Sequence, residues 1–321
     1  MKIVFLDSHV ANPGDLSWDR LEAIGELAVY ERTSTTESPL IAERIGNAEI
    51  VITNKTPISR DTLDKCPSVR IIAVIATGYN VVDVNAAADK GIPVVNVPGY
   101  ATSNVAQFNI ALLLEICSHI GEHSRGVYEG RWASCPDFCY WDYPAISLQG
   151  KTAGIIGLGS IGQATARLLK AFGMDVLGSS RHQKDIPEDI VTQCSTERVL
   201  QESDIIYLCC PMTSETEGII CTENIYRMKD GVIIINTARG QLVNENDLKD
   251  ALVSGKVRAA AVDVVSAEPI REDNPLLSAP NCIITPHIAW LSDDARQLML
   301  DTTCSNIEAY LSGRKQNVVN M

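Results

Sequence analysis

Residues 152–172 constrain the fold of this chain more than any other stretch. An apolar run over 152–156 is typical of a buried strand, and it leads directly into residues 157–162, which have the pattern G-x-G-x-x-G. The following residues, 163–172, are rich in Ala and Leu and predict a helix. A strand, a glycine-rich turn and a helix in this order predict a parallel α/β sheet with a dinucleotide-binding site.

The residues of this turn have separate tasks in such a site. Gly157 permits the tight turn, Gly159 lets the backbone approach a pyrophosphate, and Gly162 lets the helix pack closely on the strand. The first N–H groups of the helix, around Ser160 and Ile161, then face the phosphates at the positive end of the helix dipole. The alternative is an ordinary glycine-rich turn that binds nothing.

Composition and charge limit the partners of the chain. Its 321 residues suit about two domains, and 45% of them are hydrophobic. The formal net charge of −13 disfavours nucleic acid and anionic membrane surfaces as partners, although a local arginine can still bind a small anion. No apolar run approaches the ~20 residues of a membrane span, and residues 1–7 predict a strand instead of a signal peptide.

The ten cysteines predict neither disulfides nor a metal site. None are spaced as C-x-x-C, and several lie in apolar runs, where cysteine behaves as a small hydrophobic residue. Cys135 and Cys139 lie four residues apart, but we find no further nitrogen or sulfur ligands near them in the sequence. Without a secretory signal, reduced thiols in the cytoplasm are the simplest interpretation.

Apolar runs alternate with helical patterns along most of the chain. Over the first 98 residues we expect strands at 2–7, 27–30, 50–53, 71–76 and 94–97, with a first helix at 16–25. From residue 151 we expect strands at 152–156, 175–178, 205–209, 232–236, 259–264 and 283–284. This alternation predicts two α/β units, each a doubly wound parallel sheet.

The segment between these units predicts a long helix and a long loop. Asn104 is expected as an N-cap with Gln107 in the capping-box position, and the helix runs from Val105 to about Glu122. Because it is apolar on most faces, it is expected between domains or between subunits. The aromatic stretch 132–143 predicts a loop that packs at a dimer interface or caps a substrate cleft. A last helix over 292–311 can return to the first unit.

The residues after the strand at 175–178 bear on the choice of dinucleotide. An NAD site places an acidic residue at this strand end, on the ribose 2′-hydroxyl, but here Ser180 and Arg181 follow. A small hydroxyl and an arginine favour the 2′-phosphate of NADP(H) over NAD(H). The alternative is a solvated arginine beside an NAD site.

Three side chains of complementary chemistry follow apolar strands in the second unit. Arg239 follows 232–236, Glu268 follows 259–264 and His287 follows 283–284. Because ligands bind at the carboxyl ends of parallel strands, the three are expected to meet at one site. Arginine can bind a carboxylate through two parallel hydrogen bonds, and histidine is an acid–base near neutral pH whose tautomer a neighbouring carboxylate fixes.

Four motifs together resemble the D-isomer-specific 2-hydroxyacid dehydrogenases, and they occur in order over essentially the whole chain. The four motifs are G-x-G-x-x-G at 157–162, N-T-A-R-G at 236–240, D-V at 263–264 with E-P at 268–269, and T-P-H-I-A-W at 285–290. Residues 76–80 and 286–290 resemble the glycerate dehydrogenase/hydroxypyruvate reductase branch. Val81 departs from that branch, which often has a second asparagine there.

The resemblance implies a domain organisation and an activity. Residues 1–98 with 289–321 would form a flavodoxin-like substrate domain, and 99–288 an NAD(P)-binding Rossmann domain, with substrate in the cleft between them. The implied reaction is reversible hydride transfer between NADP(H) or NAD(H) and a small 2-oxo acid, with hydroxypyruvate or glyoxylate expected first. A dehydrogenase for a bulkier 2-oxo acid and a dinucleotide-sensing corepressor are the alternatives.

The resemblance also implies residue roles. Arg239 would bind the carboxylate and the carbonyl oxygen of the substrate, His287 would exchange the proton of that oxygen, and Glu268 would pair with His287. Backbone N–H groups near Thr77 and Gly78 would hold the carboxylate. The further cofactor contacts that the family implies are Thr237, Ala238 and Asp263 at the nicotinamide, and Cys209 and Pro211 on the adenosine side. The helix from residue 104 would build a homodimer interface.

Overall fold

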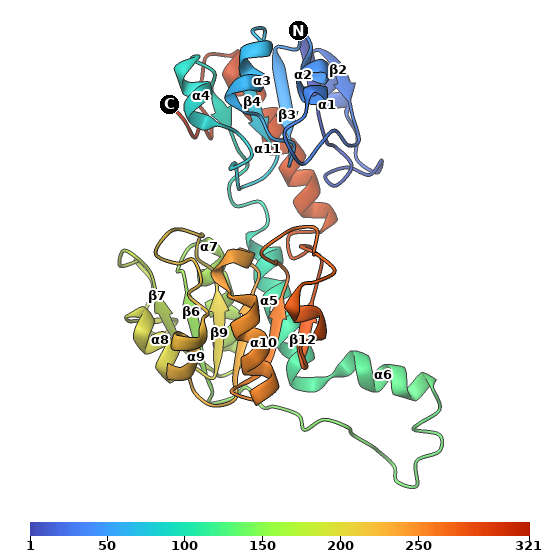
Figure 1. The fold of residues 1–321 in the computed structure, drawn as a ribbon, viewed down its shortest axis with the longest axis vertical. Helices are drawn as coiled ribbons and strands as arrows, with labels where there is room; N and C mark the ends of the chain where they lie inside the picture. Colours follow the sequence, from blue (N-terminus) through green and yellow to red (C-terminus); the bar gives the residue numbers. More distant parts are fainter. The chain divides into compact units, whose positions relative to one another are not determined.

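A computed structural model describes residues 1–321, which divide into two compact units. Unit 1 comprises Met1–Tyr100 together with Leu291–Met321, and unit 2 comprises Ala101–Trp290 (Figure 1). The sequence-based limits at 98/99 and 288/289 differ from these boundaries by two residues. Both units contain one parallel sheet covered by helices, which confirms the predicted fold class.

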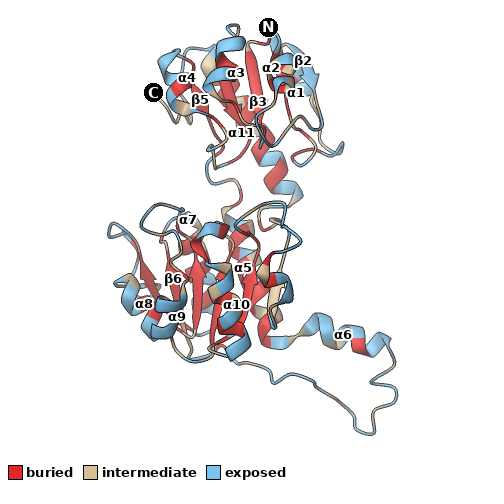
Figure 2. Cartoon of the chain, in the orientation of Figure 1, coloured by how far each residue is buried: buried red, intermediate tan, exposed pale blue.

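Unit 1 contains a five-stranded parallel sheet in the order β2-β1-β3-β4-β5. This is the strand order of flavodoxin-like sheets. Its strands are β1 (Lys2–Phe5), β2 (Glu26–Val29), β3 (Ile50–Thr53), β4 (Ile71–Val74) and β5 (Val94–Val95). Its first four helices are α1 (Asp19–Glu22), α2 (Pro39–Ile45), α3 (Arg60–Lys65) and α4 (Val84–Asp89). Every residue of β3 and β4 is buried, as their mainly apolar sequences require in a sheet covered on both faces (Figure 2).

The helix α1 is shorter than the stretch 16–25 that the sequence predicts. The Asn12 side chain accepts hydrogen bonds from the Gly14 and Leu16 N–H groups and donates one to the Leu16 carbonyl oxygen. These bonds hold the backbone in a turn, because a short polar side chain competes with helical hydrogen bonding. The helix therefore begins only at Asp19.

The last helix of the chain belongs to unit 1. The helix α11 (Asp293–Leu311) is capped by the Ser292 hydroxyl and packs against β4, which confirms the predicted return of this segment. After α11 the chain runs along β5, where Val318 forms an antiparallel bridge with Val95. We call residues 314–321 the C-terminal tail.

Unit 2 contains a seven-stranded parallel sheet in the order β12-β11-β10-β9-β6-β7-β8. The chain enters in the middle at β6, extends one way to β8 and then the other way from β9, which is the Rossmann arrangement. The strands are β6 (Thr152–Ile156), β7 (Asp175–Ser179), β8 (Thr192–Gln193), β9 (Ile205–Leu208), β10 (Val232–Asn236), β11 (Val257–Val262) and β12 (Cys282–Ile284). The helices are α5 (Thr102–Ser118), α6 (Ile120–Tyr128), α7 (Ser160–Ala171), α8 (Thr196–Glu202), α9 (Thr222–Arg227) and α10 (Glu245–Ser254), with short 3-10 turns η1 (Gly240–Leu242) and η2 (Pro275–Ser278).

The boundaries of α5 correct two sequence predictions. The helix begins at Thr102 after Ala101, without a side-chain cap, so the prediction of Asn104 as N-cap is wrong. It ends at Ser118 because His119 adopts a left-handed conformation with φ of 48°, so a single helix to Glu122 is also wrong. The apolar faces of α5 are buried in the core of unit 2, against α7, β10 and β11.

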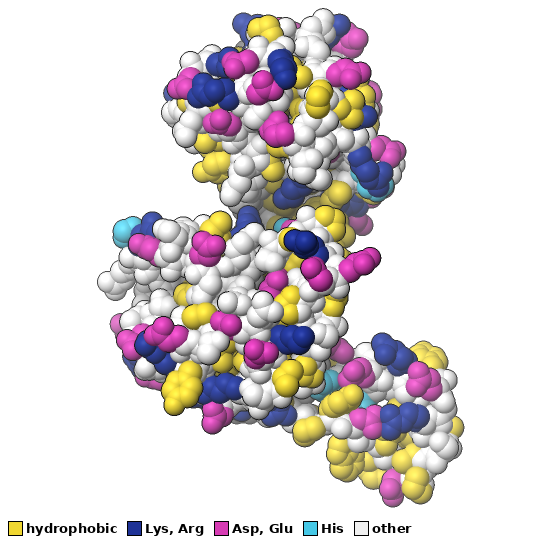
Figure 3. Space-filling model, viewed as in Figure 1, with side chains coloured by type: hydrophobic (Ala, Val, Ile, Leu, Met, Phe, Trp, Pro, Cys, Tyr) yellow, Lys and Arg dark blue, Asp and Glu magenta, His cyan; other side chains and the backbone are white.

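An arm extends from unit 2 beyond α5. It consists of α6 and residues 129–142, and it lies apart from the sheet (Figure 1). Its own hydrogen bonds hold it together: Arg131 pairs with Asp142, and the Tyr140 hydroxyl donates to the His123 carbonyl oxygen at 3.0 Å. Hydrophobic side chains gather on its surface (Figure 3).

No helix in the structure has the length and apolar character needed to cross a membrane.

Candidate active site

The glycine-rich turn lies at the point where the strand order of unit 2 reverses. Gly157 follows β6 and has a φ of 107°, which favours glycine. A Cβ atom on Gly157 would lie 2.5 Å from the Cys209 carbonyl carbon, because the turn passes directly over the end of the neighbouring strand β9. This position, between β6 and β9, is where doubly wound sheets open a crevice for a ligand.

The start of α7 fits the pyrophosphate of a dinucleotide. A Cβ atom on Gly162 would lie 2.1 Å from the Gly157 carbonyl oxygen, so only glycine allows this approach of helix and turn. Gly159, by contrast, has no heavy atom within 4 Å of its Cβ position, which leaves open space beside the backbone. No side chain caps α7, so its first N–H groups, at Ser160 and Ile161, are available to an anion.

The end of β7 carries the residues that we expect near the adenosine ribose. Ser179 is buried and accepts a hydrogen bond from the Thr196 hydroxyl at 3.0 Å. The Ser180 hydroxyl donates to the His182 carbonyl oxygen at 2.6 Å, and Arg181 forms an ion pair with Glu215 at 3.0 Å. Both members of this pair are largely exposed, so the pair contributes little to stability and separates easily.

The end of β9 carries Cys209 and Pro211, which the resemblance places on the adenosine side. Burial raises the pKa of the Cys209 thiol to about 12, so this thiol stays protonated at neutral pH. Pro211 is exposed. No group of three or more His, Cys, Asp or Glu side chains is placed to hold a metal ion.

The turn that carries Arg239 is held by buried asparagines. The buried Asn236 side chain accepts from the Ala238 N–H at 3.0 Å and donates to the Arg239 carbonyl oxygen at 2.8 Å. The Thr237 hydroxyl donates to Asn109 on α5, at 2.8 Å. The Arg239 guanidinium is exposed and donates to the Ala238 carbonyl oxygen at 2.6 Å, which leaves its other N–H groups available to a ligand.

A glycine allows the loops after β10 and β11 to touch. A Cβ atom on Gly240 would lie 1.9 Å from the Val265 carbonyl carbon, so any other residue would separate the two loops. The Gln241 side chain also donates to the Ser266 carbonyl oxygen at 3.0 Å. The loop that contains Arg239 is therefore fixed against the loop that leads to Glu268.

His287 and Glu268 form a hydrogen-bonded pair. The His287 Nδ1 atom lies 2.7 Å from Oε2 of Glu268, and about one third of each side chain is exposed. His287 adopts a left-handed conformation with φ of 57°, which is unusual for a residue other than glycine. Its N–H donates to the Asp263 carbonyl oxygen at 2.8 Å, a bond that helps to hold this strained backbone.

Asp263 organises the loop that carries His287. Its buried carboxylate accepts three hydrogen bonds, from the Thr285 hydroxyl at 2.6 Å, the Ile288 N–H at 2.9 Å and the Ala289 N–H at 2.8 Å. The resemblance placed Asp263 beside the nicotinamide, and sequence reasoning missed this second task. An aspartate directly after a buried strand was the only signal for it.

The register of the sheet brings the three loops together. Asn236 pairs with Val262, and Val262 pairs with Ile284, so β10, β11 and β12 end side by side. Arg239, Glu268 and His287 therefore follow adjacent strand ends of unit 2. Thr77 and Gly78 belong to unit 1, where they follow β4.

Comparison with known proteins gives consistent similarities. A sequence model described as the NAD binding domain of D-isomer specific 2-hydroxyacid dehydrogenases matches residues 110–289. The chain is 55% identical to the hydroxypyruvate reductase of Blautia hydrogenotrophica, over 100% of both chains. It is 40% identical to the glycerate dehydrogenase of Methylorubrum extorquens, over 99% of this chain and 98% of the other. A solved acyclic imino acid reductase in complex with NADPH and D-Arg is 29% identical, with a TM-score of 0.87 over 99% of this chain and 100% of the other.

Proposed function

The chain belongs to the family of D-isomer-specific 2-hydroxyacid dehydrogenases, and we propose that within this family it reduces hydroxypyruvate or glyoxylate. Membership makes it an oxidoreductase that acts on CH–OH groups with NAD(P). The substrate proposal is carried by the 55% identity, over the full length of both chains, to a hydroxypyruvate reductase.

We propose that His287 is the acid–base of the reaction. Glu268 bonds to Nδ1, so it fixes the ring orientation and stabilises the imidazolium, while Nε2 exchanges the proton. During reduction, the proton at Nε2 moves to the 2-oxo oxygen of the substrate, and during oxidation it returns. The bound dinucleotide supplies or accepts the hydride.

Arg239 binds the substrate in this proposal. Its exposed guanidinium offers several N–H groups in one plane, which suits a carboxylate and an adjacent carbonyl oxygen. The same contact polarises the carbonyl group. Backbone N–H groups of Thr77 and Gly78 add further donors to the carboxylate, as the family resemblance implies.

We infer a preference for NADP(H) over NAD(H). No acidic side chain follows β7 directly, and Ser180 and Arg181 stand where a ribose 2′-phosphate needs room and positive charge. The ion pair of Arg181 with Glu215 is exposed, so Arg181 can turn to a phosphate at small cost. One relative of known structure was solved with NADPH.

We also infer a homodimer that forms through the arm. Tyr128, Phe138 and Trp141 on the arm are 90%, 89% and 73% exposed, and no part of unit 2 covers them. Large aromatic side chains this exposed usually mark an interface. A second copy of the chain is the partner that we propose, and the arm joins α5 in the expected interface, because α5 keeps an exposed stripe through Ser103, Gln107 and Ala111.

The substrate proposal is tested by the consumption of NADH and NADPH over a panel of 2-oxo acids. Hydroxypyruvate and glyoxylate are expected to give the highest kcat/KM, and phenylpyruvate and branched 2-oxo acids lower values. A panel in which phenylpyruvate gives the highest value would overturn the substrate proposal and leave the family assignment intact. Arg239→Ala, which removes the proposed substrate contact, is measured beside Arg227→Ala, a control that removes an exposed arginine paired with Glu223 on α9.

A further inference from the structure

A chain of asparagine side chains in unit 1 links the C-terminal tail to the loop after β4. Asn317 on the tail donates to the Oδ1 atom of Asn306 on α11 at 2.8 Å. Asn306 donates to the Asn96 carbonyl oxygen at 2.8 Å, and the Asn96 side chain donates to the Thr77 carbonyl oxygen at 2.8 Å. We call Asn317, Asn306 and Asn96 the asparagine relay.

Two further hydrogen bonds join the segments that the relay connects. The Asn96 N–H donates to the Asn317 carbonyl oxygen at 3.1 Å, so the tail is also bonded directly to the segment after β5. The Thr77 hydroxyl donates to the Val97 carbonyl oxygen at 2.8 Å, which joins the loop after β4 to the segment after β5 a second time. Asn96 and Asn306 are buried, being 8% and 1% exposed.

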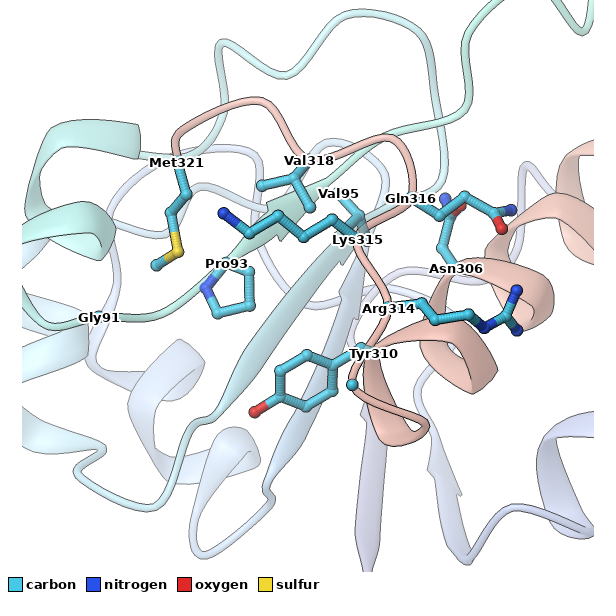
Figure 4. Close-up of a pocket in the computed structure, with 11 residues that line it drawn as sticks. Gly91, Pro93, Val95, Asn306, Tyr310, Arg314, Lys315, Gln316, Val318 and Met321 are labelled. Carbon is cyan, nitrogen blue, oxygen red and sulfur yellow. The ribbon is translucent and has the colours of Figure 1, made fainter.

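Figure 4 shows one member of the relay, Asn306, beside the C-terminal tail. The Asn306 side chain projects from α11 beside Gln316, and the tail continues past Val95 to Val318. Asn317 itself has a φ of 51°, a left-handed conformation that asparagine tolerates better than most residues. The tail is thus shaped to present an amide side chain to α11.

Buried amides are a costly way to fill a core. Each must find partners, since an unsatisfied buried polar group destabilises a protein by about 1–3 kcal/mol, whereas apolar side chains of similar size need no partner. What a fully satisfied network adds is a single geometry for the groups that it joins. The group at the end of this network is the Thr77 carbonyl oxygen.

Fixing this carbonyl group also fixes the next N–H group. The peptide unit is planar and trans, so the C=O of Thr77 and the N–H of Gly78 point in opposite directions. When Asn96 holds the Thr77 oxygen, it sets the direction of the Gly78 N–H, which donates to no group of the protein. This is one of the N–H groups that the proposed function assigns to the substrate carboxylate.

We propose that the asparagine relay positions the Gly78 N–H for the substrate carboxylate, so that the C-terminal tail controls affinity for the 2-oxo acid. The inference rests on the proposed function, because it takes the Thr77–Gly78 loop as a substrate-binding loop. Asn96, Asn306 and Asn317 are positioning residues: they act through the backbone of Thr77 and touch no substrate.

The test compares Asn96→Ala with Asn320→Ala. Asn320 also joins the tail to the segment of β5, through bonds with the Val94 N–H and the Ile92 carbonyl oxygen, but it makes none to the β4 loop. Asn96→Ala is expected to raise the KM for hydroxypyruvate about tenfold, the loss of one charge-assisted contact. The KM for the dinucleotide is expected to stay unchanged, and Asn320→Ala should leave both constants unchanged.

Michaelis constants separate a positioning role from a structural one. A variant that only unfolds more easily loses active enzyme and lowers the apparent kcat, while the KM of the remaining enzyme stays the same. Thermal unfolding is measured for every variant. If Asn96→Ala does not fold, Asn317→Gly takes its place, because glycine keeps the left-handed backbone and removes only the relay side chain.

A third variant, Gly78→Val, tests the substrate loop itself. If Gly78→Val raises the KM for hydroxypyruvate and Asn96→Ala leaves it within twofold, the relay proposal is wrong and the proposed function stands. If Gly78→Val has no effect on that KM, the assignment of this loop to the substrate is wrong, and the relay proposal fails with it. An equal rise in Asn320→Ala would also overturn the relay.

Discussion

Replacing Asp263 with asparagine should displace His287 without touching the proposed chemistry directly. The carboxylate of Asp263 accepts three hydrogen bonds from the loop 285–289. Two of them, from Thr285 and Ile288, reach Oδ1 and can persist with an amide oxygen. The third, from the Ala289 N–H to Oδ2, is lost, because an amide NH2 group would face another donor.

The magnitude follows from these three bonds. Loss of charge weakens each of the two retained bonds by about 1 kcal/mol, and the lost bond leaves unsatisfied buried donors at about 2 kcal/mol. We therefore expect the free energy of unfolding to fall by about 4 kcal/mol, a large share of the roughly 5–15 kcal/mol that native proteins possess. Because His287 is held at an unusual φ, its position should loosen, and kcat should fall by about 100-fold, as a 1 Å misplacement can cause.

The measurements are urea unfolding, steady-state kinetics and dinucleotide affinity by fluorescence titration. Asp204→Asn is the matched control, since Asp204 precedes β9, at the opposite ends of the strands from Asp263, and accepts from the Thr152 N–H and from Lys229. It should lose stability and keep its kcat. If Asp263→Asn instead weakens dinucleotide affinity and spares kcat, Asp263 acts on the cofactor and our account of the loop is refuted.

Three further predictions concern the proton, the cofactor and the arm. His287→Ala should lower kcat by orders of magnitude with the fold intact. The control is His182→Ala, which replaces an exposed histidine after β7 and should leave kcat unchanged. Near-normal turnover of His287→Ala would refute the acid–base assignment. Arg181→Ala should raise the KM for NADPH about tenfold and leave the KM for NADH unchanged. Glu215→Gln, which removes the ion-pair partner of Arg181, should lower the KM for NADPH. An enzyme that prefers NADH more than about tenfold would contradict both expectations. Phe138→Ser should shift the protein from dimer towards monomer in light scattering, and an unchanged mass would count against the arm as the interface.

The sequence predicted the central strands well because burial on both faces leaves a direct trace. The bounds of β3, β6 and β10 agree with the predicted ranges to the residue, since each is mainly apolar and is followed by a polar or glycine residue. The strand β8 was missed, because a two-residue edge strand has no periodicity to detect.

The details of the site were less predictable because they depend on contacts distant in the sequence. That Arg239, Glu268 and His287 would meet was expected because each follows an apolar strand, and the pairing of β10, β11 and β12 places these strand ends side by side. The support of the Arg239 turn by Asn109, 128 positions earlier in the chain, left no pattern in the sequence. Nor did the left-handed backbone of His119, which ended a helix that apolar periodicity extended further.

The two-segment construction of unit 1 has a consequence for synthesis on the ribosome. The first 100 residues contain all five strands of its sheet, but the helix α11, which packs on β4, comes roughly 190 residues later. At about 5–20 residues per second, translation leaves β4 without this cover for about 10 to 40 s. Unit 2 lies between the two segments of unit 1, so the nascent N-terminal sheet obtains its last helix only after all of unit 2 has been synthesised.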